Sequence, residues 1–201
     1  MNPLAPASMT SLFPIALFLL VAVATPGPNN LVVMRTAARS GWTGSLPAMA
    51  GIVVGGLVLL ALVAAGAGSA FSAWPWLRAT VEIGGAAYLV WLGIRLFVAA
   101  GGDGAGASLP TGPGGLFGFQ FLNPKGWVMV STAVAAVPAT SPSNALIHLA
   151  PLFVVIPILG LLMWAVLGDV LAPGLARPMV RRWTDRVLGA LLVLAALLLF
   201  I

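Results

Sequence analysis

The chain has 201 residues, of which 61% are hydrophobic and only 6% are charged. Its mean hydropathy is +1.10 and its net charge is +5. A water-soluble domain carries roughly a quarter charged residues, so this composition excludes a soluble fold and predicts a protein whose solvent is lipid. Nearly all of the basic residues lie in short connections between apolar runs, which is typical of membrane proteins and argues against nucleic-acid binding.

Six apolar runs follow one another along the chain. Five of them have about 20 residues or more, enough for a helix to cross roughly 30 Å of hydrocarbon. We therefore predict an all-α membrane protein with about six transmembrane helices, or five and a short terminal helix. A cleaved signal peptide is the less favoured alternative for the first run. The expected spans are Leu12–Val33, Leu46–Ala65, Trp76–Ala99, Leu116–Val137, Leu146–Leu167 and Val187–Ile201.

The basic residues are distributed unevenly between the connections. The second and fourth connections contain Arg78 alone, whereas the first, third and fifth contain seven Arg residues. By the positive-inside rule, the odd connections are expected in the cytoplasm and both termini outside. The seven are Arg35, Arg39, Arg95, Arg177, Arg181, Arg182 and Arg186.

One connection, residues 101–115, is rich in Gly and Pro and divides the chain into two blocks of three spans, residues 1–100 and 116–201. Such a composition predicts a flexible linker inside a single transporter domain. Because each block has an odd number of helices, the blocks must insert in opposite senses, as in an inverted repeat.

Polar, proline-containing interruptions occur in the first and fourth spans, where the sequence reads TPGPNN at residues 25–30 and NPKG at residues 123–126. Each proline frees a backbone carbonyl, and irregular backbone in a membrane needs protein or a water-filled cavity beside it. Paired interruptions in corresponding spans indicate a transporter's midplane site, although prolines that merely kink the helices are the alternative. The predicted substrate-binding residues are Pro26, Gly27, Pro28, Asn29, Asn30, Asn123, Pro124 and Lys125.

Lys125 is the only Lys in the chain and lies ten residues into its apolar run. It must snorkel to the membrane surface, bind a substrate carboxylate, or respond to protonation. Glu82 and Asp169 lie near predicted span ends, which favours interfacial carboxylates over a role in proton coupling. Close helix packing is the expected role of four glycines in the second and third spans: Gly51, Gly55, Gly84 and Gly85.

Several function classes lack the residues that they need. The chain has no Cys, one His and four acidic residues, so neither disulfides nor a metal site built by the protein is expected. No nucleophile–base–acid set and no glycine-rich phosphate loop is visible. We therefore expect no enzyme, no cofactor and no ATP-driven transport, and the energy would come from an ion or substrate gradient.

The motifs taken together resemble the LysE/RhtB-type family of amino acid exporters. They are TPGPNN at residues 25–30, Gly51-x-x-x-Gly55, the string GGAAYLVWLG at residues 84–93, and residues 117–126, which end in NPKG. The resemblance implies a fold of six spans and proton-coupled efflux of amino acids across the cytoplasmic membrane. Family members commonly carry an acidic residue where this chain has Gly56, so its substrate or coupling is expected to differ.

The leading hypothesis is a secondary exporter of neutral or weakly polar amino acids. Its expected partners are the amino acid and the lipid bilayer, and homo-oligomerisation stays open. The alternatives are a non-transporting membrane scaffold subunit and a passive, channel-like pore. An exporter should need the polar residues of the two interruptions, whereas a scaffold should tolerate their replacement.

Overall fold

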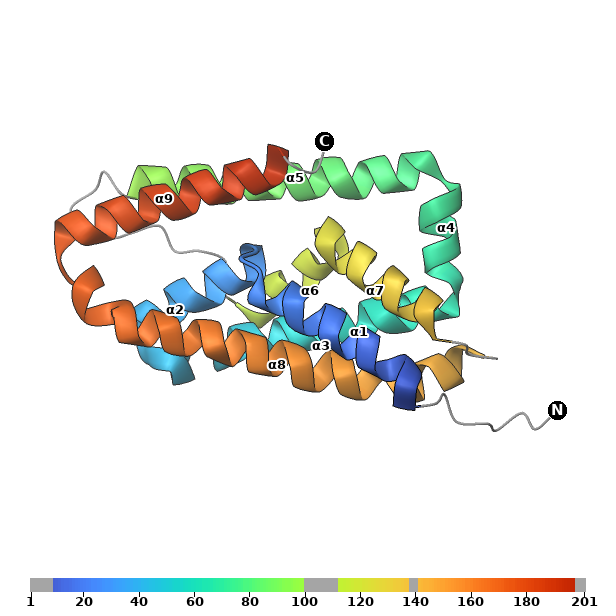
Figure 1. The fold of residues 1–201 in the computed structure, drawn as a ribbon. Coiled ribbons are helices and arrows are strands. Elements are labelled where there is room, and N and C mark those ends of the chain that lie inside the picture. Colours follow the sequence, from blue (N-terminus) through green and yellow to red (C-terminus); the bar gives the residue numbers. More distant parts are fainter. Residues whose placement is uncertain (1–8, 100–111, 138–140, 198–201) are drawn as a thin grey trace.

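The computed structural model describes residues 9–99, 112–137 and 141–197 (Figure 1). These residues form helices and short connections, with no strand among them, which confirms the predicted all-α class. The elements are α1 (Met9–Ala24), α2 (Pro28–Gly44), α3 (Leu46–Leu62), a π-helical segment η1 (Val63–Ala67), α4 (Gly68–Ala73), α5 (Pro75–Ala99), α6 (Pro113–Leu122), α7 (Pro124–Ala136), α8 (Pro142–Leu175) and α9 (Pro178–Leu197).

Proline marks most of the helix boundaries. Within the described ranges, six α-helices begin at a proline: α2, α5, α6, α7, α8 and α9. The ring fixes φ near the helical value, and the first turn of a helix needs no N–H donor there. The residue before a proline is pushed towards extended backbone, so each of these prolines also ends the segment that precedes it.

The structure does not confirm six spanning helices. The described residues contain three helices long and apolar enough to cross a membrane. They are Leu46–Ala73, which joins α3, η1 and α4, Pro75–Val98 of α5, and Pro142–Leu175, which is α8. A fourth span results if α1 and α2, which are bent by 53° at their break, count as one. The expected fourth span is divided into α6 and α7, of 10 and 13 residues. Each reaches only about 15–20 Å, too short for hydrocarbon of about 30 Å.

The ends of the later elements also differ from those expected. α8 has 34 residues and is about 51 Å long at 1.5 Å per residue, so Asp169 lies within it and not beyond its end. α9 begins at Pro178 instead of Val187, so Arg181, Arg182, Asp185 and Arg186 belong to a helix and not to a loop. Those charges explain why α9 is not among the candidate spans. Residues 113–115 of the expected linker form the start of α6, and residues 101–111 lie outside the described residues.

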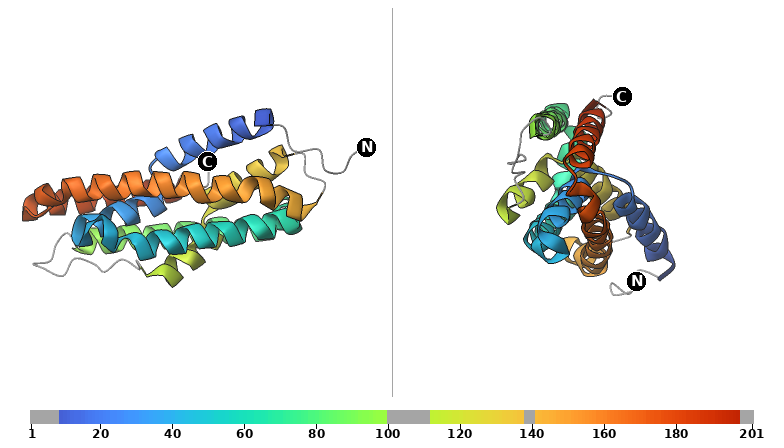
Figure 2. Two further views of the ribbon diagram at one scale, coloured as in Figure 1. Left: turned by 90° about the horizontal axis from the view of Figure 1, so that it is seen from below. Right: turned by 90° about the vertical axis from the view of Figure 1, so that its left-hand side faces the viewer.

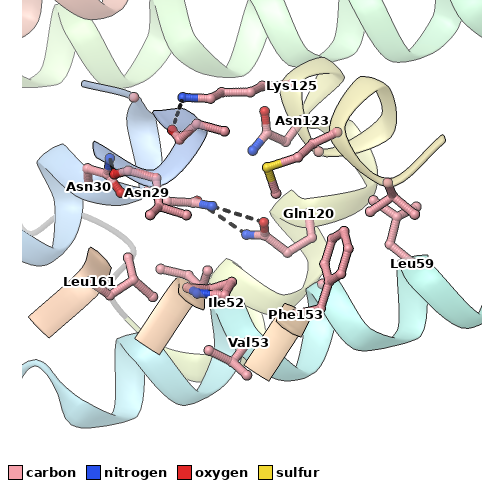
Figure 3. Close-up of a pocket in the computed structure, with 18 of the residues that line it drawn as sticks. Asn29, Asn30, Ile52, Val53, Leu59, Gln120, Asn123, Lys125, Phe153 and Leu161 are labelled. Atoms are coloured by element: carbon pink, nitrogen blue, oxygen red, sulfur yellow. Dashed lines mark hydrogen bonds between the residues drawn. The ribbon is translucent and has the colours of Figure 1, made fainter. Parts of the chain in front are cut away.

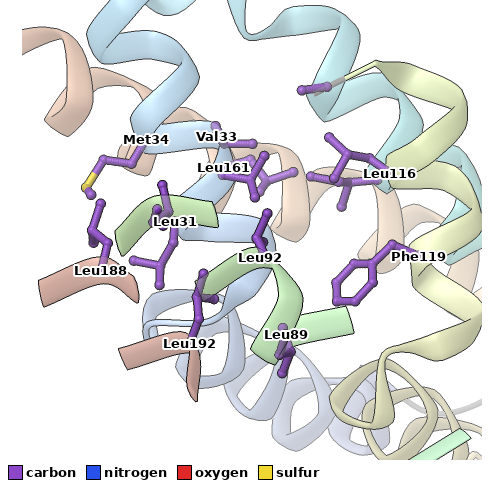
Figure 4. Packing of buried hydrophobic residues seen from close by; sticks show 14 of the residues in the cluster. Leu31, Val33, Met34, Leu89, Leu92, Leu116, Phe119, Leu161, Leu188 and Leu192 are labelled. Atoms are coloured by element: carbon purple, nitrogen blue, oxygen red, sulfur yellow. The ribbon is translucent and has the colours of Figure 1, made fainter. Parts of the chain in front are cut away.

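Two apolar clusters hold the helices together. One joins α2, α3, α5, α6, α8 and α9, and its members include Leu31, Leu92, Leu116, Leu161 and Leu192 (Figure 4). The other joins α1, α3, α7 and α8 with neighbouring residues of η1 and α5. Many large apolar side chains remain exposed on the outer faces, such as Phe13 and Ile147 at 71% and 72%. An outer surface of this kind is suited to lipid, where such exposure carries little cost.

The charges are segregated between the two ends of the elongated molecule. Figure 1 shows the C-terminal ends of α2 and α5 and the α8–α9 turn at one end. The start of α1, the α4–α5 corner and the start of α8 lie at the other, and Figure 2 gives the same bundle from below and end-on. The basic residues of the odd connections therefore gather at one end, and Arg78, at the start of α5, lies near the other.

Candidate functional site

The breaks of the two interrupted segments meet near the middle of the molecule (Figure 1). Gly27 is extended, with φ −158° and ψ 169°, and Pro28 begins α2 directly after it. Asn123 likewise has φ −89° and ψ 102° before Pro124, the first residue of α7. Both breaks therefore follow from the steric effect of a proline on the residue before it.

Side chains supply the hydrogen bonds that the first break removes. Pro26 has no N–H to donate to the carbonyl of Ala22, four residues earlier. The ammonium of Lys125 donates to this oxygen at 2.8 Å and lies 3.4 Å from the Thr25 carbonyl oxygen. The side-chain amide of Asn30 donates to the Val23 and Thr25 carbonyl oxygens at 2.9 and 3.0 Å. The carbonyls freed by the broken helix thus face polar side chains and not lipid.

A second polar link joins α2 to α6. The amides of Asn29 and Gln120 donate to each other, Nδ2 to Oε1 at 2.9 Å and Nε2 to Oδ1 at 3.2 Å (Figure 3). Nε2 of Gln120 also donates to the Leu116 carbonyl oxygen at 2.8 Å. Gln120 is not among the site residues predicted above. It is the only Gln in the chain and lies three residues before Asn123, and these two features are the sequence signal that could have identified it.

These groups surround a pocket of about 90 Å³ between α1, α2, α3, α6, α7 and α8. Figure 3 shows Lys125, Asn123, Gln120 and Asn29 on one side of it and apolar side chains of α3 and α8 on the other. Six of the predicted site residues line it: Gly27, Pro28, Asn29, Asn30, Asn123 and Lys125. Pro26 and Pro124 do not line it, and act by shaping the breaks.

Two lining residues, Asn123 and Gly56, bear on what the pocket can hold. Asn123 is only 6% exposed, and its side chain forms no capping hydrogen bond at the start of α7. Because Asn123 lines the pocket, its amide can hydrogen-bond a ligand there. Gly56 lines the same pocket, and a Cβ added there would meet no atom within 4 Å.

The four glycines predicted to pack helices lie against α6 and the α6–α7 break. A Cβ at Gly51 or Gly85 would collide with backbone atoms of Pro113 or Leu122. At Gly55 it would lie 2.7 Å from the Phe117 carbonyl oxygen, and at Gly84 it would lie 3.3 Å from a methyl group of Leu122. The close approach of α3 and α5 thus holds the second break in place.

The acidic residues considered for coupling do not line the pocket. Glu82 accepts a hydrogen bond from Nε of Arg78 at 2.8 Å, one turn earlier on α5. Asp169 is exposed on α8. Among the described residues no group of three or more His, Cys, Asp or Glu is placed to hold a metal.

A buried ion pair that sequence analysis missed lies elsewhere, between α2 and α9. Arg35 Nη1 contacts Asp185 Oδ1, and the two residues are 6% and 2% exposed. The charge pattern of the sequence places both residues in cytoplasmic connections, because the charges near them are typical of loops. Only the packing of α9 beside α2 reveals the pair.

Comparison with known proteins assigns the family. Residues 20–201 match the sequence model of the LysE type translocator. The chain belongs to the LysE-type translocator family. As a LysE-type translocator, it is a multi-pass membrane transport protein, in agreement with its apolar outer surface.

Three relatives illustrate the similarity of this LysE-type translocator to other proteins. It is 30% identical to a cysteine/O-acetylserine efflux protein of Salmonella typhimurium over 187 residues, covering 91% of this chain and 94% of the relative. A protein of the same name from Escherichia coli K12 is 30% identical over 190 residues, with the same coverage. One from Klebsiella pneumoniae is 32% identical over 157 residues, covering 75% of this chain and 78% of the relative. No solved structure matches the chain.

Proposed function

We propose that this protein exports small amino acids with uncharged side chains across the cytoplasmic membrane, and that the proton gradient drives the export. The observation that carries the proposal is the meeting of two broken helices around one small pocket that has polar groups on one side. The relatives support the substrate class, since cysteine and O-acetylserine, named for those proteins, are small amino acids with uncharged side chains.

The polar groups of the pocket complement a zwitterionic amino acid. Lys125 carries the only charge among the lining residues, and its ammonium is the natural partner of a substrate carboxylate. The Asn123 amide can join it, since it lines the same pocket and does not cap α7. The substrate ammonium would be met by neutral oxygens, those of Asn29 and Gln120 and the carbonyls of the first break. At low dielectric such pairings are strong.

The absence of a carboxylate from the lining argues against cationic side chains. A cationic substrate side chain would bring a second positive charge close to Lys125 with no anion to balance it. A volume of about 90 Å³ also favours a small side chain. The lack of a side chain at Gly56 leaves further space on the α3 wall of the pocket.

Replacement of Asn123 by Ala tests the proposal. Its side chain forms no capping hydrogen bond at the start of α7, so Asn123→Ala should leave expression near normal. We expect the mutant to lose at least about tenfold in amino acid efflux from dipeptide-loaded cells, because one lost hydrogen bond to a charged group is worth roughly 1.5–3 kcal/mol. The matched control is Asn144→Ala, near the start of α8 and away from the pocket.

The same assay separates the competing hypotheses. Full efflux by Asn123→Ala would favour a scaffold or a site elsewhere. Efflux that equilibrates the substrate but never accumulates it against its gradient would indicate a passive pore. Collapse of the proton gradient should abolish accumulation by the wild type, and accumulation that survives this treatment would contradict proton coupling.

A further inference from the structure

A second pocket lies between α2, α8 and α9 and shares no residue with the pocket described above. Its volume is about 330 Å³, within the range of roughly 300–1,000 Å³ that is usual for ligand sites. Three arginines and one carboxylate line it: Arg35, Arg39, Arg181 and Asp185. We call it the arginine pocket.

Arg35 has hydrogen-bonding capacity that the described protein does not use. Its Nη1 pairs with Asp185, but Nε and Nη2 are buried and have no partner. Only four buried side-chain nitrogen and oxygen atoms in the described residues lack a partner, and two of them are on Arg35. Buried unpaired donors are costly, and more so when they are charged, so a ligand acceptor beside Arg35 would relieve this cost.

The charge of the lining points to an anion. Three guanidinium groups and a single carboxylate, that of Asp185, line the pocket, so its lining is positively charged. Guanidinium groups are suited to phosphate, because their planar fork donates two parallel hydrogen bonds to its oxygens. The lining adds one hydroxyl donor, that of Thr184.

The border of the arginine pocket is apolar and exposed. Leu171 of α8 and Val180 of α9 both line the pocket and are 46% and 41% exposed on the outer surface. Met179 and Trp183 of α9 are exposed beside them. A molecule with a charged head and an apolar tail could place its head among the arginines and its tail along these side chains.

We propose that the arginine pocket binds a phosphate group, supplied by the headgroup of an anionic phospholipid. The phosphate accepts hydrogen bonds from Arg35 and Arg181, and the acyl chains lie along α8 and α9. The bound headgroup links α9 to α2 and α8, across the buried Arg35–Asp185 pair. This proposal stands independently of the substrate pocket.

The test uses Arg181→Gln, because Arg181 lines the pocket while a change at Arg35 would strand the buried Asp185 charge. The matched control is Arg177→Gln, which removes an equal charge from an exposed position near the start of α9 that does not line the pocket. Arg39→Gln is a second pocket variant. The full-length proteins in detergent are titrated with phosphatidylglycerol, phosphatidylcholine or inorganic phosphate, and Tm and retained lipid in native mass spectra are measured.

Phosphatidylglycerol should raise Tm of the wild type and of Arg177→Gln. Arg181→Gln and Arg39→Gln should bind this lipid about fivefold more weakly than the wild type does. Phosphatidylcholine should have little effect. If inorganic phosphate alone reproduces the shift with the same dependence on Arg181, the phosphate site stands and its source is soluble. Equal responses of Arg181→Gln and Arg177→Gln to every probe, or equal effects of the two lipids on the wild type, would overturn the proposal.

Discussion

At the scale of single residues, side chains from both interrupted segments stabilise the first break. Pro26 removes a donor from the end of α1, and Lys125, which follows the proline of the other break, supplies one. Asn30 does the same for the Val23 and Thr25 carbonyls from the first turn of α2. Residues that the sequence marks as costly in lipid therefore have a structural role, and the same groups face the pocket.

Substitution of Lys125 separates substrate binding from coupling. Lys125→Met deletes the charge and leaves the Ala22 carbonyl without its donor, so we expect a large loss of affinity and about 1–3 kcal/mol lower stability. Lys125→Arg keeps the charge but changes its shape and reach, so affinity should fall moderately. Efflux and exchange in proteoliposomes, across a range of imposed pH gradients, measure both.

The outcome for the Arg variant identifies the role. If Lys125 must release a proton, Arg should fail as badly as Met in driven accumulation while exchange at equal concentrations survives, because guanidinium stays protonated. Arg177→Met, which removes an exposed charge outside the pocket, serves as the control. Wild-type affinity and accumulation by Lys125→Met would mean that the side chain only satisfies the broken helix.

At the scale of helices, small residues decide which elements approach closely. Lipid is as apolar as Leu, so burial of apolar surface does little to drive helices together in a membrane, and close packing must do it. α3 approaches α6 at Gly51 and Gly55, and α5 approaches the α6–α7 break at Gly85. α8 packs on α2 at Gly168, where a Cβ would collide with the backbone of Met34.

A methyl group at Gly85 should disturb both packing and transport. In Gly85→Ala the added Cβ collides with the Leu122 carbonyl oxygen and lies 3.0 Å from Pro124 Cδ, so α5 must move away from the break. We expect a fall in stability of about 1–3 kcal/mol, as for overpacked interiors. Thermal unfolding of the purified protein and the efflux assay measure the two effects.

Gly118→Ala is the matched control, because Gly118 is also helical but its added Cβ meets no atom within 4 Å. Ala is the better helix former by roughly 0.5–1 kcal/mol, so this variant should be neutral or slightly stabilised. Equal stability of Gly85→Ala and Gly118→Ala would show that the close approach of α5 to the break is unimportant.

At the scale of the whole molecule, the segregation of charge predicts its orientation. The end that carries the arginines of α2 and the α8–α9 turn should face the cytoplasm, and the start of α8 should face outside. The chain has no native Cys, so single cysteines report position without background. A membrane-impermeant thiol reagent added to intact cells should label Ser143→Cys and leave Ala176→Cys protected, both sites being exposed in the fold.

Permeabilised cells provide the control, since both cysteines should then react. Labelling of Ala176→Cys alone in intact cells would invert the orientation. Labelling of both in intact cells would place the two ends of α8 on the same side, which a helix of 34 residues crossing the membrane does not allow.

Composition and local pattern were sufficient for part of this architecture. Scarcity of charge determines a lipid-embedded, helical protein, and the prolines at residues 26, 28 and 124 determine where helices break, because their effect on backbone is local. The predicted grouping of Asn29, Asn30, Asn123 and Lys125 remains a prediction of function, but these residues do line one pocket.

The tertiary structure alone decided the rest. Hydropathy does not register a break inside an apolar run, so α6 and α7 appeared as one span, and charges inside α9 made a helix appear as a loop. Gln120 and the Arg35–Asp185 pair acquire meaning only through partners 91 and 150 residues away in sequence. Local sequence determines backbone conformation, whereas the pairing of distant polar groups depends on how helices pack, and small residues spread over the whole chain govern that packing.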